Sequence, residues 1–326
     1  MAERNRYYQG PVSDHFDGVR FFNPQHPNTD RSFGQMLQWK LHEKAAQWPK
    51  TVDSKQAKPD ARVDGLRVTM VGHATLLIQA AGLNVLTDPV WSHRASPLSF
   101  AGPGRVNPPG IAFDDLPPID AVLLSHNHYD HLDMATLKRL VAKHDPLIVT
   151  PLGNETILRD AMPKVRVATG DWGDRIALPH GAEAIIVAAH HWSARGLGDR
   201  RMALWGGFIL KTPVGQVYFA GDTGYGDGDI FRAMRRDHGP TDVALIPIGA
   251  YAPRWFMADQ HTNPDDAVRI MRDLEASNAI GIHWGSFQLT DEAREEPVAL
   301  LKRALFDHGI DEKCFPAASP GDVFNY

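Results

Sequence analysis

A run of four candidate metal ligands within six residues limits the possible folds and functions of this chain more than any other feature. His126, His128, Asp130 and His131 follow the pattern H-x-H-x-D-H, and imidazole and carboxylate are ligands that a borderline metal such as zinc selects. The apolar segment 121–124 before the run predicts a buried strand, and the pattern after the run predicts a helix. We therefore expect the run on a strand-to-helix loop, held by rigid elements on both sides.

Composition narrows the chemistry of such a site. The 326 residues are enough for one large core or two modest ones. A content of 43% hydrophobic and 22% charged residues is ordinary for a globular protein. The single cysteine, Cys314, excludes a disulfide framework within the chain and a thiolate cluster, so nitrogen and oxygen atoms would bind any metal. The net charge of −5 and the lack of a basic block argue against nucleic acid as a partner.

The sequence contains no pattern typical of secretion or of a membrane span. Residues 1–20 are polar and of mixed charge, and they lack the apolar core of a signal peptide. No stretch approaches the ~18 apolar residues of a membrane helix. We expect a cytoplasmic protein, and the sequence leaves open a peripheral contact with a membrane.

Changes in composition divide the chain into two regions. Residues 1–60 predict an N-terminal extension that packs on the main domain, 61–326. Apolar residues at helical spacing predict an amphipathic helix over 33–48. Its apolar side would comprise Phe33, Met36, Leu37, Leu41, Ala45 and Trp48. We expect this apolar side to pack on the main domain, and the alternative is that it faces lipid. The segment 91–118 is rich in proline and glycine, which is typical of a functional loop.

Elsewhere, short strands alternate with helices. Strands are expected at 66–71, 75–79, 84–87, 121–124, 147–150, near Val165, and at 184–188, 207–211, 216–220, 243–247 and 279–283. Helices are expected at 134–143, 154–162, 229–238, 264–276 and 292–308. Both halves mix strands with helices, which predicts an α/β (α+β) fold with two sheets packed together and helices outside.

Further candidate ligands end three of the predicted strands. They are the pair His190 and His191, then Asp222, then His283. A polar side chain at the end of an apolar strand is costly unless a metal or a hydrogen bond satisfies it. Together with the H-x-H-x-D-H run, these residues predict a two-metal site, and their positions alone leave open which of the two adjacent histidines contributes.

This order of residues resembles the metallo-β-lactamase superfamily, whose four-layer αββα sandwich holds one or two metals at one edge. The resemblance implies two zinc ions, with iron or manganese as alternatives. It assigns metal 1 to His126, His128 and His191, metal 2 to Asp130, His131 and His283, and a bridging role to Asp222. His191 is preferred to His190 because the following Trp192-Ser193 resembles the pairing found in the family.

Several motifs narrow the resemblance to the group of phospholipases D that hydrolyse N-acylphosphatidylethanolamine. They are VGHAT at 71–75, LTDP at 86–89, RASP at 94–97, SHNHYDHLD at 125–133, AGDTGY at 220–225 and IPIGAYAPRWFM at 246–257. The resemblance implies hydrolysis of this lipid to N-acylethanolamine and phosphatidic acid by a metal-bridging hydroxide. A lactonase, or another phosphodiesterase acting on a small soluble substrate, is the alternative. Related sheet-sandwich hydrolases often dimerise, so a homodimer is also left open.

Two other classes of protein, a di-iron redox enzyme and a binding protein with an inactive site, are disfavoured. Di-iron redox relatives carry glutamate at the position of His128 and a flavin module, neither of which this sequence shows. A binding protein with an inactive site would lack part of the ligand set, whereas all seven positions are filled here.

The resemblance also suggests roles for residues around the metals. Asp130 would orient the nucleophile, and His261 would donate a proton to the leaving group or contact the phosphate. His73 and Asp88 would support the metal ligands, because a metal-bound histidine commonly donates its second N–H to a carboxylate. The expected pocket residues are Tyr251, Arg254 and Trp255.

Overall fold

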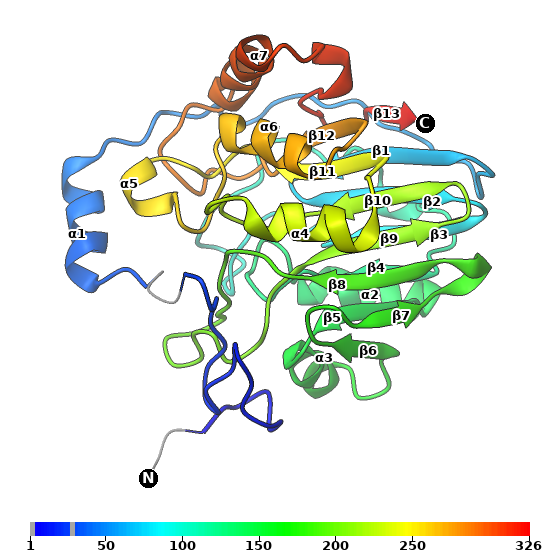
Figure 1. Cartoon of the computed structure of the whole chain (residues 1–326), viewed down its shortest axis with the longest axis horizontal. Coiled ribbons are helices and arrows are strands. Elements are labelled where there is room, and N and C mark those ends of the chain that lie inside the picture. The colour runs from blue at the N-terminus through cyan, green and yellow to red at the C-terminus, as the bar shows by residue number, and fades with distance from the viewer. Residues whose placement is uncertain (1–3, 27–29) are drawn as a thin grey trace.

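Two β-sheets pack face to face, with helices on their outer faces, in the computed structural model of the chain, which describes residues 4–26 and 30–326 (Figure 1). One sheet has seven strands in the order β13-β1-β2-β3-β4-β5-β6, and the other has six in the order β12-β11-β10-β9-β8-β7. Layers of helix, sheet, sheet and helix confirm the expected αββα fold class.

The first sheet is antiparallel at β13, β1, β2 and β3 and parallel from β3 to β6. Its strands are β1 (Leu66–Gly72), β2 (Thr75–Ala80), β3 (Leu83–Thr87), β4 (Ala121–Leu123), β5 (Leu147–Pro151), β6 (Val167–Gly170) and β13 (Val323–Asn325). Alternate residues of β2 face opposite ways, as the pleat requires. Leu76 and Ile78 join the core between the sheets, whereas Leu77 faces the helices outside.

The second sheet is antiparallel from β7 to β10 and parallel from β10 to β12. Its strands are β7 (Arg175–Ala177), β8 (Glu183–Val187), β9 (Gly207–Thr212), β10 (Gly215–Phe219), β11 (Val243–Pro247) and β12 (Asn278–Ile282). The sequence did not predict the edge strands β7 and β13. Each has three residues, two of them exposed, so neither carries an apolar pattern long enough to recognise.

Helices cover both outer faces. Apolar side chains of α2 (Met134–His144) and α3 (Asn154–Ala161) pack on the first sheet. Those of α4 (Asp229–His238), α6 (Pro264–Asp273) and α7 (Glu296–His308) pack on the second. The remaining helical segments are α1 (Phe33–His42), α5 (Arg254–Met257), η1 (Phe113–Asp115), η2 (Pro179–Gly181) and η3 (Glu312–Cys314). Among the described residues, no helix is long and apolar enough to cross a membrane.

The N-terminal helix differs from its prediction in length and in the face that it buries. It ends at His42, because the chain then extends and Ala46 donates its N–H to the carbonyl of Asp291. Trp39 is buried against Phe256, with ring centroids 4.9 Å apart. Of the expected apolar side, Met36, Leu37 and Leu41 are 44%, 46% and 69% exposed; the side chain of Phe33 lies outside the described part of the chain.

The segment before this helix contacts the domain through two aromatic residues. Phe16 and Phe21 pack with Leu204 and Trp205, and Asn5 donates to the carbonyl of Met202 at 2.8 Å. These contacts support the proposal that residues 1–60 form an extension packed on the domain 61–326; residues 1–3 and 27–29 of it lie outside the described residues.

Candidate metal centre

The candidate ligands meet at one edge of the sandwich, at the ends of strands that run in the same direction. Asp88 follows β3, the H-x-H-x-D-H run follows β4, and Asp222 follows β10. His191 lies after β8, and His283 follows β12 directly. The run occupies the loop between β4 and α2, as expected. Five segments distant in sequence therefore place polar side chains at a common edge, where α/β proteins commonly bind ligands.

Three histidines form the first group of candidate ligands. The Nε2 atoms of His126 and His191 lie 2.9 and 3.2 Å from Nδ1 of His128. Burial lowers the pKa of His128 to about 4 and holds the pKa values of His126 and His191 well below their usual range. All three rings are therefore neutral at pH 7 and offer lone pairs. Nε2 of His126, Nε2 of His191 and Nδ1 of His128 converge, and this set of three nitrogen atoms fits the ligands of zinc.

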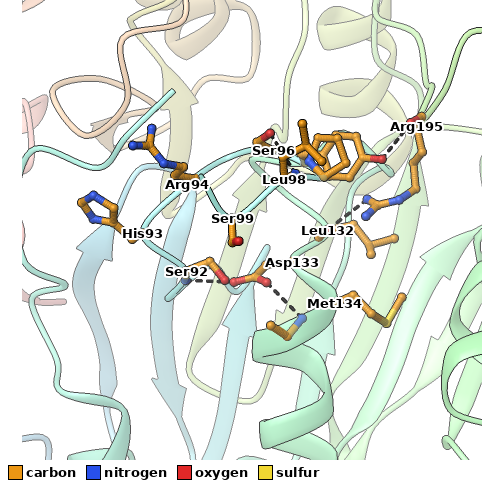
Figure 2. Close-up of a pocket in the computed structure, with 13 residues that line it drawn as sticks. Ser92, His93, Arg94, Ser96, Leu98, Ser99, Leu132, Asp133, Met134 and Arg195 are labelled. Carbon is orange, nitrogen blue, oxygen red and sulfur yellow. Dashed lines mark hydrogen bonds between the residues drawn. The ribbon is translucent and has the colours of Figure 1, made fainter. Parts of the chain in front are cut away.

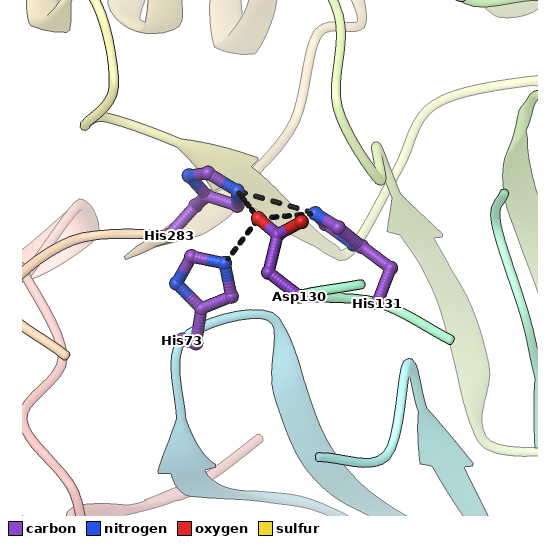
Figure 3. Close-up of side chains that lie close together, drawn as sticks. All are labelled: His73, Asp130, His131 and His283. Carbon is purple, nitrogen blue, oxygen red and sulfur yellow. Dashed lines mark hydrogen bonds and ion pairs between the residues drawn. The ribbon is translucent and has the colours of Figure 1, made fainter. Parts of the chain in front are cut away.

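The second group is arranged around the carboxylate of Asp130 (Figure 3). Its Oδ2 lies 3.0 Å from Nε2 of His73 and 3.4 Å from Nε2 of both His131 and His283. Figure 3 shows the three rings directed toward this carboxylate. The sequence placed His73 among the supporting residues, whereas the structure brings it into this group with the predicted ligands. Since His73 directly follows β1, its position after a strand was the available clue.

Asp222 lies between the two groups. Its Oδ2 is 3.2 Å from Nε2 of His131 and 3.6 Å from Nε2 of His191, and its Oδ1 is 3.1 Å from Nε2 of His283. Although burial opposes ionisation, the positive charges of His131 and His283 hold the pKa of Asp222 well below its usual range. This geometry supports a bridging role.

Two buried carboxylates therefore require positive charge at this edge. Burial disfavours charge on His283, yet Asp222 and Asp130 raise the pKa of this imidazole to about 9. The same two carboxylates, with Asp88, raise the pKa of His131 well above its usual range against the effect of burial. Buried charge of one sign is stable only when it is paired. Bound metal cations would neutralise these two carboxylates in place of protonated histidines, so the residues present fit a two-metal centre.

Asp88 orients the ligand loop. Its Oδ1 accepts from the backbone N–H of Ser125 at 2.7 Å, and its Oδ2 accepts from the hydroxyl of Ser125 at 2.5 Å and lies 2.6 Å from Nδ1 of His131. With Nδ1–H donated to Asp88, Nε2 of His131 is left facing the centre. His191 is oriented in the same way, because its Nδ1 lies 3.0 Å from the carbonyl of Gln260.

The structure distinguishes the two adjacent histidines. His191 clusters with His126 and His128, and its ring also lies near Asp222 and His261. The ring of His190 instead packs edge-on against His26, with centroids 4.5 Å apart, and its backbone N–H donates to the hydroxyl of Thr223. Successive residues of an extended chain point to opposite sides, so only one of the two can face the metal centre.

Arg195 fixes the ligand loop from outside and was not anticipated from the sequence. Its Nη1 donates to the carbonyls of Asn127 and Leu132, at 2.8 and 3.0 Å. Its guanidinium stacks on Tyr129 at 4.1 Å from the ring centroid, and the Tyr129 hydroxyl donates back to the carbonyl of Arg195. The arginine thus joins the two segments that carry the first ligand group. No local pattern marks it, since its partners lie more than sixty residues away.

A cavity of about 340 Å³ opens over the centre. It is lined by Trp39, Ala95, His128, Tyr129, Asp130, Trp192, Asp222, Ala250, Phe256, Met257, Gln260, His261, Leu289 and Thr290. His261 therefore reaches the site. Its buried Nδ1 lies 3.9 Å from Oδ2 of Asp222 and has no hydrogen-bond partner among the described residues, and burial lowers its pKa to about 4.

The lining differs from the predicted one at the short helix α5. Arg254 pairs with Asp266 at 2.6 Å, and Trp255 is 41% exposed. The hydroxyl of Tyr251 donates to Glu296 at 2.8 Å. The cavity is lined by Phe256 and Met257 instead, because one helical turn directs neighbouring side chains to different sides.

Fold and site together define a metal-dependent hydrolase with the metallo-β-lactamase architecture. Residues 83–284 match the family described as the beta-lactamase superfamily domain. The chain belongs to this superfamily. It is 36% identical over 312 residues to N-acyl-phosphatidylethanolamine-hydrolyzing phospholipase D 1 of Caenorhabditis elegans, an alignment that covers 89% of this chain and 87% of the relative.

Other relatives match a smaller share of their own length. An uncharacterised protein of Mycobacterium tuberculosis is 40% identical over 73% of this chain and 64% of the relative. The mitochondrial N-acyl-phosphatidylethanolamine-hydrolyzing phospholipase D of Saccharomyces cerevisiae is 33% identical over 72% of this chain and 50% of the relative. Among solved structures, an isothiocyanate hydrolase from Delia radicum gut bacteria has a TM-score of 0.61 at 22% identity, covering 80% of this chain and all of that one. That likeness concerns the fold alone.

Proposed function

We propose that this hydrolase cleaves the phosphodiester of N-acylphosphatidylethanolamine and releases N-acylethanolamine and phosphatidic acid. The observation that carries the proposal is the position of Asp222, which contacts both ligand groups at the base of a cavity with aromatic walls. The names of two relatives, from Caenorhabditis elegans and Saccharomyces cerevisiae, support the substrate class.

The proposed cofactors are two zinc ions. Imidazole predominates in both ligand groups, which favours zinc over metals that prefer oxygen. His126, His128 and His191 would hold one ion, Asp130, His131 and His283 the other, and Asp222 both. Two such ions, when bound, supply Lewis-acid stabilisation of the phosphoryl oxygens and lower the pKa of water.

Two side chains that face the cavity, Asp130 and His261, would form hydrogen bonds with the attacking water and the substrate. Although burial opposes ionisation, the charge of His131 keeps the pKa of Asp130 well below its usual range, so this carboxylate is ionised and can accept a hydrogen bond from the attacking water. His261 is neutral at pH 7, because its pKa of about 4 is far lower. It therefore acts as a neutral hydrogen-bond donor to the phosphoryl or leaving oxygen, and its buried Nδ1 has no partner among the residues that the structure describes.

An apolar surface beside the cavity supports a lipid substrate. Trp39 lines the cavity from α1, and the same helix exposes Met36, Leu37 and Leu41. Figure 1 shows α1 and α5 side by side at the edge where the strands end. A helix that presents apolar residues to water is typical of a segment that rests in a membrane interface. We propose that α1 contacts the cytoplasmic face of a membrane and that the acyl chains of the substrate enter the cavity past Trp39.

The reaction is tested by mass spectrometry of the products. Zinc-loaded protein incubated with N-acylphosphatidylethanolamine in detergent micelles is expected to yield phosphatidic acid and N-acylethanolamine in equal amounts. Protein stripped of metal with a chelator is the control and should give neither. Unchanged lipid, from protein that holds two metals, would contradict the proposed substrate and favour a lactone or a small soluble phosphodiester.

The membrane contact is tested by sedimentation with phospholipid vesicles. Leu37→Glu combined with Leu41→Glu is expected to lower vesicle binding by about tenfold or more, since each change removes buried apolar area and adds a charge. Leu300→Glu is the matched control, because Leu300 is 42% exposed on α7. Equal binding by the double variant and the wild type would contradict the role of α1.

A further inference from the structure

Two loops that border the metal centre are each held by an arginine. Arg195 donates to the loop that carries the H-x-H-x-D-H run, and Figure 2 shows its hydrogen bond to the carbonyl of Leu132. The second arginine is Arg254, the first residue of α5, whose guanidinium donates to the loop 258–263 between α5 and α6. Arg254 does not line the metal cavity, so its contribution to the site is indirect.

The loop 258–263 brings two functional groups to the metal centre on successive residues. The carbonyl of Gln260 lies 3.0 Å from Nδ1 of His191 and orients that ring. The next residue is His261, whose Nδ1 lies 3.9 Å from Oδ2 of Asp222. A displacement of this loop by about 1 Å would move both groups, and errors of that size can cost about 100-fold in rate. The position of the loop is therefore important for the proposed reaction.

Backbone hydrogen bonds fix the two ends of this loop. The N–H groups of Gln260 and His261 both donate to the carbonyl of Met257, at 2.9 Å, so the first part of the loop continues the turn of α5. The N–H of Thr262 donates to the carbonyl of Thr223, also at 2.9 Å. Thr223 directly follows the proposed bridging ligand, so the end of the loop is joined to the segment that carries it.

Arg254 holds the loop at the histidine itself. Its Nη1 donates to the carbonyl of His261 at 2.7 Å, and its Nη2 donates to Oδ2 of Asp266 at 2.6 Å. Asp266 is buried and completes the capping box of α6 with Asn263. A planar guanidinium thus spans His261 and the first turn of α6, and its rigid fork sets the spacing between them. Because breaking an ion pair of a buried carboxylate is costly, this link is firm.

We propose that Arg254 is a positioning residue for the hydrolysis and holds His261 where its imidazole can donate to the phosphoryl or leaving oxygen. This inference rests on the role proposed above for His261. Because Arg254 does not line the cavity, its loss is expected to lower turnover rather than substrate binding. Lysine does not replace it fully, since a single ammonium group lacks the fork that spans both acceptors.

A double-mutant cycle between Arg254→Ala and His261→Ala tests the proposal with metal-loaded protein and the lipid in micelles. Arg254→Ala is expected to lower kcat by about tenfold to 100-fold and to leave KM within about threefold, because a transition-state contact is weakened. In the His261→Ala background the same change should lower kcat by less than about twofold. Equal losses in the two backgrounds, which a general structural role would give, would overturn the proposal. Metal content should be the same in every variant.

Amide hydrogen exchange, measured by mass spectrometry of peptides, tests the link without any substrate. Arg254→Ala is expected to speed exchange about tenfold or more in peptides that cover 258–263, because the loop opens more often. Arg269→Ala is the matched control, since this arginine of α6 pairs with Asp265 through a half-exposed side chain, and it should exchange like the wild type.

The outcomes separate this inference from the proposed function. Unchanged exchange in Arg254→Ala would overturn the link between Arg254 and the loop. A wild type without hydrolytic activity would contradict the proposed function, whereas an active wild type with additive losses in the cycle would contradict only the role of Arg254. If Arg254→Ala does not fold, Arg254→Lys keeps the charge beside Asp266 and should show a smaller loss with the same dependence on His261.

Discussion

Asp222→Ala is expected to lose bound metal and activity together while the fold is retained. The carboxylate contacts His131, His191 and His283 at 3.1 to 3.6 Å, so its removal withdraws the shared negative charge from both ligand groups. Under the proposed function, loss of this shared carboxylate should lower turnover by about 10³-fold or more, because the metals that would stabilise the phosphoryl charge are lost with it.

Metal content by plasma mass spectrometry and turnover are the measurements, with circular dichroism as the check on folding. Asp227→Ala is the control, since this aspartate lies on the same loop but is exposed. It should keep both metal and activity. A folded Asp222→Ala protein with full activity would exclude the two-metal arrangement.

The second large effect expected is a difference in metal affinity between two single variants at adjacent positions, His191→Ala and His190→Ala. His191→Ala is expected to lower metal affinity by at least about 100-fold, because its Nε2 belongs to the first ligand group. His190→Ala should retain the metals, since that ring packs against His26. Both side chains are buried, so each variant loses a similar amount of packing and the comparison isolates ligation.

Competition with a chromogenic zinc chelator, in the same buffer for both proteins, measures the zinc affinities of the two variants. Retention of metal by His191→Ala, with loss by His190→Ala, would reverse the assignment. Loss by both variants would indicate that the loop collapses when either ring is removed, and thermal unfolding of the two proteins would then have to differ from that of the wild type.

The sequence by itself determined the local elements of the fold. Alternating and continuous apolar runs gave β1 to β5 and β8 to β12 within one or two residues, because a strand buried between layers needs apolar side chains along its length. The helix α6 begins at Pro264, with Asn263 in a capping box, as the residue types predict. The H-x-H-x-D-H run was identifiable for the same reason: four candidate ligands on one short loop need no distant partner to be recognised.

Only the tertiary structure decided how side chains from separate segments converge. It placed His73 beside Asp130 and His191, rather than His190, beside His128. It also joined Arg195 to the loop that carries the H-x-H-x-D-H run and turned Phe256 rather than Trp255 toward the cavity. It also left Leu37 and Leu41 exposed on a helix whose buried face is set by Trp39. Local periodicity says which side of an element is apolar, but the packing of two sheets against each other determines which atoms meet at their edge.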